Sequence, residues 1–137
     1  MLGLSAKARY GLQAAYDLAL HAGAGPRQIR DIASGQDIPH QFLEQLLVSL
    51  KRAGLVESFR GSRGGYTLAR EPAAIRVLEV LTCLDGELSM ASSEWADQLL
   101  RAQLEGLQSA VADILSVTLA DLVSAKRQAE SAISYDI

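Results

Sequence analysis

The stretch Leu55-Val-Glu-Ser-Phe-Arg-Gly-Ser-Arg-Gly-Gly-Tyr-Thr-Leu68 decides the fold, because the spacing of apolar residues changes here from a helical to a strand-like period. Residues 55–59 and 65–68 are predicted to form two short strands. Between them, residues 60–66 contain three glycines and two arginines. Glycine loosens the backbone and adds no side-chain packing, so this segment is predicted to be an exposed hairpin tip that approaches another molecule closely. The arginines indicate that this molecule is negatively charged.

Three helices are predicted before the hairpin. The first begins near Ser5, a candidate N-cap, and is followed by a short helix that closes at Gly35. The third ends at residues 53–54 and is strongly amphipathic, with five side chains predicted to point inward: Phe42, Leu43, Leu46, Leu47 and Leu50. Helix, helix–turn–helix and β-hairpin in this order predict a winged helix-turn-helix, in a chain that is mainly α with a small β-hairpin wing.

The second half of the chain is predicted to hold a linking helix, a polar loop and two further helices. A linking helix over residues 75–84 leads through a polar loop at 87–93 to a long helix from about residue 94 to about residue 116. Apolar residues spaced 4, 3, 4 and 3 give this long helix a seam of the coiled-coil type: Leu100, Leu104, Leu107, Val111 and Ile114. Thr118 and Asp121 then form a candidate capping box for a last helix, which is expected to end near Ala129.

These elements predict a division of the chain into three parts. Residues 1–72 form the winged helix-turn-helix domain, and residues 73–131 form the linking helix, the effector loop and the dimerisation helices. Residues 132–137 are expected to be a frayed tail, as chain termini commonly are.

Composition and charge limit the class of protein. No apolar run in the 137 residues approaches the roughly 20 that a membrane span needs, so we expect a cytoplasmic protein without a membrane partner. Residues 1–76 carry ten basic and six acidic side chains, a net charge of +4, whereas residues 77–137 carry three and ten, a net charge of −7. This asymmetry indicates two separate tasks, and only the basic half suits a phosphate-bearing partner.

The outward face of the third helix is the first candidate site. A helix presented by a helix-turn-helix fits the major groove of DNA, where its exposed N-terminal residues reach the edges of the bases. Those residues here are His40, Gln41, Glu44 and Gln45. Glutamine can bond adenine and glutamate can accept from cytosine. The alternative is an ordinary solvated face, because every amphipathic helix has a polar side.

The hairpin tip is the second candidate site. An arginine on such a tip suits a narrow minor groove, where the negative potential is enhanced, and nearby backbone N–H groups can hold phosphate. The tip residues predicted to contact DNA are Arg60, Ser62, Arg63, Gly64 and Gly65, with Lys7 and Tyr10 of the first helix as candidates for backbone phosphate. A flexible, solubilising turn is the alternative. A nucleotide-phosphate loop is excluded because the glycine spacing matches neither the dinucleotide nor the Walker pattern.

Several ordered segments closely resemble one known family. They are Leu4-Ser-x-Lys-x-x-Tyr10, Ile38-Pro-x-x-Phe-Leu-Glu-Gln-Leu46, Ala53-Gly-Leu-Val-x-Ser58, Arg60-Gly-x-x-Gly-Gly-Tyr-x-Leu-Ala69 and, later, Val117-Thr-Leu-Ala-Asp-Leu-Val123. Together they resemble the Rrf2 family of bacterial winged-helix transcription regulators, the IscR-, NsrR- and CymR-like proteins.

The resemblance implies a homodimer that binds a pseudo-palindromic operator in double-stranded DNA. It implies base readout by Gln41, Glu44 and Gln45, and insertion of Arg60 into the minor groove. Members of the family often carry a proline where this chain has Ser62, and Arg63 is an additional charge.

The expected sensor departs from the iron–sulfur members of this family. Those members carry three cysteines in the loop that corresponds to residues 87–93, where this chain has none. We therefore expect no iron–sulfur cluster and no metal site, and Cys83 is expected to be a buried packing thiol. The candidate effector region contains Cys83, Met90 and Trp95, and the effector is either a small molecule or a protein. Alternatively, Trp95 anchors the long helix to the winged domain.

The leading hypothesis is a dimeric, sequence-specific DNA-binding regulator that acts as a repressor. The alternative is a winged-helix adaptor that works through protein contacts of its acidic half. An enzyme is not supported, because two histidines and one cysteine show no spacing typical of a catalytic triad or a metal site.

Overall fold

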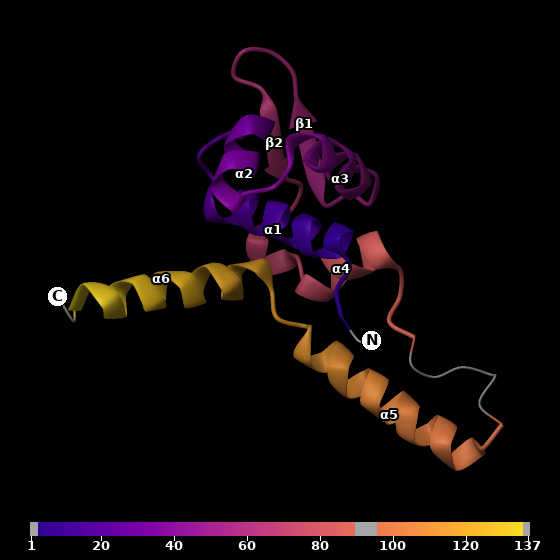
Figure 1. The fold of residues 1–137 in the computed structure, drawn as a ribbon. Coiled ribbons are helices and arrows are strands. Elements are labelled where there is room, and N and C mark those ends of the chain that lie inside the picture. The colour runs from indigo at the N-terminus through magenta and orange to yellow at the C-terminus, as the bar shows by residue number, and fades with distance from the viewer. Residues whose placement is uncertain (1–2, 90–95, 136–137) are drawn as a thin grey trace.

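The chain folds into a helical body with one small hairpin at its edge (Figure 1). The computed structural model describes residues 3–89 and 96–135. Over these residues the elements are α1 (Ala6–Leu20), α2 (Ile29–Gln36), α3 (His40–Arg52), β1 (Val56–Phe59), β2 (Gly65–Leu68), the 3-10 helix η1 (Pro72–Ala74), α4 (Val77–Asp85), α5 (Gln98–Ile114) and α6 (Leu119–Tyr135). This confirms a mainly α fold with a β-hairpin wing. Within the described ranges, no helix combines the length and the apolar character that a membrane crossing requires.

One core joins the winged part to the later helices. Leu43 and Leu47 of α3, Val80 of α4 and Leu119 of α6 are all completely buried. The buried side of α1 is rich in alanine, and Gly11 faces Leu84 of α4 so closely that a Cβ atom at this position would overlap its side chain. The core therefore contains residues from both sides of the predicted division at residues 72/73.

Two predicted capping arrangements are present. Ser5 Oγ accepts a hydrogen bond from the Ala8 N–H at 3.0 Å, and it donates to Asp85 Oδ1 at 2.6 Å, so the start of α1 is tied to the end of α4. At the start of α6, the Thr118 N–H donates to Asp121 Oδ2 at 2.8 Å and the Asp121 N–H donates to Thr118 Oγ1 at 3.2 Å. Reciprocal bonds of this kind satisfy N–H groups that a helix start otherwise leaves unpaired.

The prediction that Gly35 closes the second helix was wrong. The helix continues to Gln36, and Asp37 closes it in the left-handed region with φ of 53°. Gly35 instead leaves room for the Asp17 and Arg27 side chains, because a Cβ atom there would lie 3.0 Å from Asp17 Oδ1 and 3.1 Å from Arg27 Nη2.

The prediction that Phe42 points inward was also wrong. Its side chain is 41% exposed and meets the Tyr10 ring edge-on, with 5.4 Å between the ring centroids. The Arg9 guanidinium lies over the same Tyr10 ring, 4.5 Å from its centroid. Phe42 thus joins the starts of α1 and α3 at the surface instead of filling the core.

The bounds of the later helices differ from those predicted. The linking helix α4 begins at Val77, after η1, and α5 begins at Gln98 with Asp97 as its N-cap. Glu94 and Trp95, where the long helix was expected to begin, are outside the described residues. The last helix continues to Tyr135, so most of the expected tail is helical.

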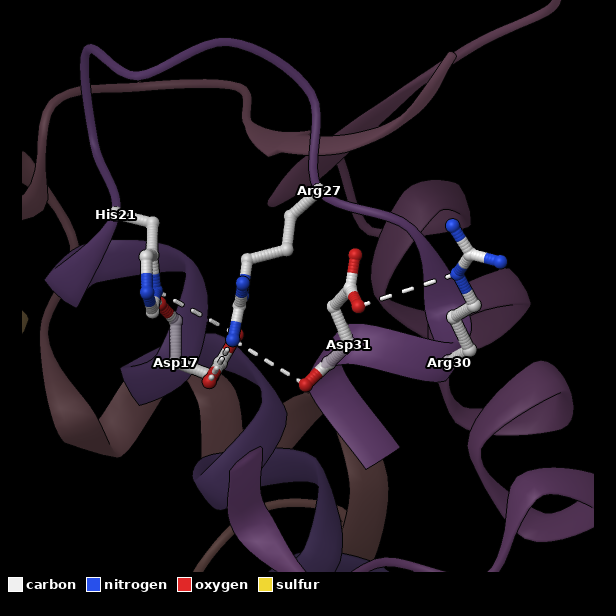
Figure 2. Close-up of polar contacts among 5 residues, drawn as sticks. All are labelled: Asp17, His21, Arg27, Arg30 and Asp31. Carbon is white, nitrogen blue, oxygen red and sulfur yellow. Dashed lines mark hydrogen bonds and ion pairs between the residues drawn. The ribbon is translucent and has the colours of Figure 1, made fainter. Parts of the chain in front are cut away.

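Arg27 connects the hairpin to the helices (Figure 2). Its Nε donates to Asp17 Oδ2 at 2.6 Å and its Nη2 donates to the Asp31 carbonyl at 3.2 Å. Its backbone pairs with Tyr66 of β2 through two hydrogen bonds of 2.9 and 2.8 Å. Asp17 is only 1% exposed in the otherwise apolar buried side of α1, so this carboxylate depends on its cationic partner.

Gly65 allows the hairpin to lie close to the Arg27 backbone. Its φ is 142°, in a region that favours glycine, and an added Cβ atom would overlap the Arg27 carbonyl. The base of the wing is therefore fixed to the chain between α1 and α2.

We expect Arg27→Ala to lower the free energy of unfolding by about 3 kcal/mol, because it removes the guanidinium bonded to the buried Asp17 carboxylate and leaves His21, whose Nδ1 lies 3.8 Å from Asp17 Oδ2, as the nearest side-chain partner. Urea denaturation followed by circular dichroism measures this change. Arg30→Ala is the matched control, since Arg30 faces Asp31 at 4.0 Å in an exposed pair and its loss should cost less than about 1 kcal/mol. Equal effects of the two substitutions would contradict the role given to Arg27.

Candidate nucleic-acid interface

The polar face of α3 is exposed and held in a fixed orientation. Leu43, Leu46, Leu47 and Leu50 are each 0–1% exposed and anchor the opposite side of the helix in the core. The predicted reading residues are all exposed on the outer side: His40, Gln41, Glu44 and Gln45. His40 Nδ1 lies 3.6 Å from Glu44 Oε1, one turn further along the helix. The face therefore offers both donors and acceptors from the first two turns of α3.

The wing tip is a tight turn with two arginines. The Gly64 N–H donates to the Gly61 carbonyl at 2.9 Å, and Gly61 has φ of 101°. Gly64 itself is buried, and an added Cβ atom would overlap the Phe59 carbonyl. Arg60, Ser62 and Arg63 are exposed. The glycines therefore permit a tight turn that presents the Arg60, Ser62 and Arg63 side chains outward.

Both wing arginines are available to a ligand. Among the residues that the structure describes, no carboxylate forms an ion pair with Arg60 or Arg63. The hairpin and α3 lie at one end of the molecule, whereas α5 and α6 extend from the other (Figure 1). The exposed arginines and the polar face of α3 are thus carried at the same end.

The two candidates on α1 differ in exposure. Lys7 is exposed, whereas Tyr10 is half-buried between Arg9 and Phe42. Tyr10 therefore lies beside the first turn of α3, and only its outer part can meet a ligand.

The predicted seam of α5 is largely uncovered. Leu100, Leu107 and Ile114 are 44%, 53% and 71% exposed, while Leu104 and Val111 are half-buried. No residue of α5 is buried. A row of exposed aliphatic side chains along one helix is a feature of interaction surfaces.

The candidate effector region is only partly described. Cys83 lies on α4, half-buried against the core, with its Sγ 3.6 Å from the Ser49 carbonyl. Burial raises the pKa of the Cys83 thiol, and nearby Lys7 opposes this effect. Met90 and Trp95 are outside the described residues.

The donor set does not fit a cysteine-ligated iron–sulfur cluster. Such clusters are held mainly by several thiolates, and the whole chain contains one cysteine. Across residues 3–89 and 96–135, no three side chains of His, Cys, Asp or Glu lie together as metal ligands could.

Sequence reasoning missed the residues that position the wing. Besides the Asp17–Arg27 pair, Gln28 Nε2 donates to the Ser62 carbonyl at 3.3 Å and links the start of α2 to the wing tip. The sequence held one signal for the Asp17–Arg27 pair, because Asp17 is an acid on the apolar side of the first helix and a buried acid needs a partner. Nothing in the sequence pattern pointed to Gln28.

Comparison with known proteins places the chain among transcription regulators. Residues 4–125 match the family model described as "Rrf2: Iron-dependent Transcriptional regulator". The chain is 37% identical to the regulator CymR of Bacillus subtilis, over 88% of this chain and 89% of that protein. It is 38% identical to the regulator IscR of Cereibacter sphaeroides, over 88% and 86% of the two chains. The solved structure of CymR, "the Global Cysteine Regulator of B. subtilis", superposes with a TM-score of 0.83 at 38% identity, over 90% of this chain and 98% of that one.

We expect Cys83 to react with iodoacetamide at pH 8 more slowly in the folded chain than in urea, because burial raises its pKa and leaves less thiolate. Mass spectrometry of the intact protein reports this residue alone, since the chain has no other cysteine. The folded rate should continue to climb at a pH where the unfolded rate has levelled off. A folded thiol that reacts faster at pH 7 would contradict the assignment as a packing residue.

Proposed function

Because the chain belongs to the Rrf2 family of DNA-binding transcription regulators, which are not enzymes, we propose that it is a homodimeric repressor that reads a pseudo-palindromic operator. It acts on chromosomal DNA in the cytoplasm. The observation that carries the proposal is the position of two exposed arginines, Arg60 and Arg63, at the same end of the molecule as the exposed polar face of α3.

In the proposed complex, α3 enters the major groove and the wing enters the adjoining minor groove. Gln41 and Gln45 have the amide groups that bond adenine, and Glu44 has the acceptor that suits cytosine. Arg60 inserts into a narrow minor groove, where the negative potential is enhanced, and Arg63 holds phosphate. Gly64 and Gly65 let the wing backbone lie close to the DNA. Support comes from the exposure of the α3 and arginine side chains and from the tight turn that presents the wing tip.

Lys7 and His40 complete the proposed interface. Lys7 is exposed at the start of α1, where a lysine can hold backbone phosphate without reading sequence. His40 pairs with Glu44, and this contact would orient the Glu44 carboxylate toward a base.

We propose that the seam of α5 pairs two copies of the chain. Five aliphatic positions at coiled-coil spacing are exposed or only half-buried in one copy, and a second copy would cover them. A two-fold dimer places its two α3 helices on half-sites about 34–36 Å apart, so the operator would be palindromic. A dimer bound across a promoter would exclude RNA polymerase, and the chain would repress transcription in this way.

Regulation is proposed to act through the end of α4 and the segment that follows it, without an iron–sulfur cluster. Asp85, the last residue of α4, accepts the hydrogen bond of Ser5, which caps α1. A small molecule or protein that moves this segment would loosen the start of α1 and with it the placement of the winged part.

We expect Arg60→Ala/Arg63→Ala to weaken binding to an operator obtained by random-pool selection by at least about tenfold and to flatten its salt dependence, because phosphate and minor-groove contacts are lost. Fluorescence anisotropy at several salt concentrations measures both quantities. Lys126→Ala/Arg127→Ala is the matched control, since it removes the same charge from α6 at the other end of the molecule. Equal losses would show that net charge rather than the wing governs binding, and a protein that selects no DNA would favour an adaptor.

We expect the parent chain to elute as a dimer in size-exclusion chromatography with light scattering, and Leu107→Lys to elute as a monomer, because the substitution places a charge in the proposed seam. Leu99→Lys is the control on the same helix. Leu99 is 72% exposed but lies off the seam, so this variant should stay dimeric. A monomeric parent, or a dimer that survives Leu107→Lys, would refute the seam.

A further inference from the structure

Val48 lies in the middle of the outward face of α3. Its side chain is 45% exposed, on the opposite side of the helix from the four buried leucines. Gln41, Gln45, Val48 and Arg52 follow one another at spacings of 4, 3 and 4, which places them in a single stripe along the helix. Val48 is the apolar member of a stripe that is otherwise polar or charged.

Helix stability does not account for a valine at this position. A β-branched side chain is restricted in a helix and is a weaker helix former than the alanine, lysine or glutamine usual on exposed faces. Val48 also adds nothing to the core, because the leucines fill that side. Single exposed apolar residues are common, and Val48 differs from them by its place within a polar stripe.

The helix rise places Val48 opposite a particular base pair. Val48 lies three residues beyond Gln45, about 4.5 Å further along the axis of α3. Successive base pairs are about 3.4 Å apart. If Gln45 reads one base pair, Val48 therefore faces the neighbouring one.

We propose that Val48 contacts the C5 methyl group of a thymine next to the base pair that Gln45 reads. Thymine is the base that presents a methyl group in the major groove, and apolar side chains contact it there. At the same place cytosine has only a hydrogen atom, so Val48 selects thymine over cytosine. This inference rests on the proposed function, because it requires α3 to lie in the major groove.

The test replaces each thymidine of the selected operator, one at a time, by deoxyuridine, which removes a single methyl group and keeps base pairing. In each half-site we expect one position where the affinity of the parent protein falls about fourfold, the effect of one buried methyl group. Val48→Ala should bind the unmodified operator correspondingly more weakly and should show no further loss at that position.

Two control variants separate this contact from general effects on DNA. Val117→Ala makes the same change at a valine that is 41% exposed in the turn between α5 and α6, and it should keep the parent's deoxyuridine response. Gln45→Ala should alter base preference at its own position and still keep that response.

The outcomes distinguish the two proposals. A selected operator that the parent protein binds equally well with every thymidine replaced would overturn the thymine contact alone. The same deoxyuridine loss in Val48→Ala as in the parent would also overturn it. Failure of random-pool selection to recover any operator would overturn the proposed function together with this inference.

Discussion

The ion pair between Asp17 and Arg27 is the constraint on which the arrangement of the winged part depends. A carboxylate buried in α1 requires a cation, and Arg27 supplies it from the chain that leads into α2. The backbone of the same residue bonds β2, so one position fixes α1, α2 and the wing relative to one another. Gly35 and Gly65 both lie against Arg27, Gly35 near its guanidinium and Gly65 near its carbonyl, so a larger residue at either position would crowd it.

The helix α3 is fixed to the same support by different means. Its four buried leucines pack into the core formed with α1 and α4, so its rotation about its own axis is determined. The two elements proposed to read DNA therefore share α1 as a common base. A recognition surface that is ordered before binding loses less conformational freedom on association, and more of its contact energy appears as affinity.

The order of the elements, the wing and both capping arrangements could be predicted from the sequence, because they depend on local signals such as glycine position, apolar period and capping residues. Contacts between elements could not be predicted this way. The Asp17–Arg27 pair, the space required at Gly35 and the edge contact of Phe42 depend on which segments meet, and periodicity does not report this. The exposed site residues on α3 and the wing followed from patterning, whereas Gln28, which supports the wing tip, did not.

The extension of α5 and α6 away from the wing has an electrostatic consequence. These helices and α4 belong to the part of the chain with a net charge of −7, while the hairpin and α3 belong to the part with a net charge of +4. Such a separation makes the molecule an electric dipole. In the field of a polyanion a dipole experiences a torque, which turns the positive end forward before contact and raises the fraction of encounters that begin in a productive orientation. A protein with an acidic overall composition can in this way approach nucleic acid quickly, and its acidic end discourages binding in the reverse orientation.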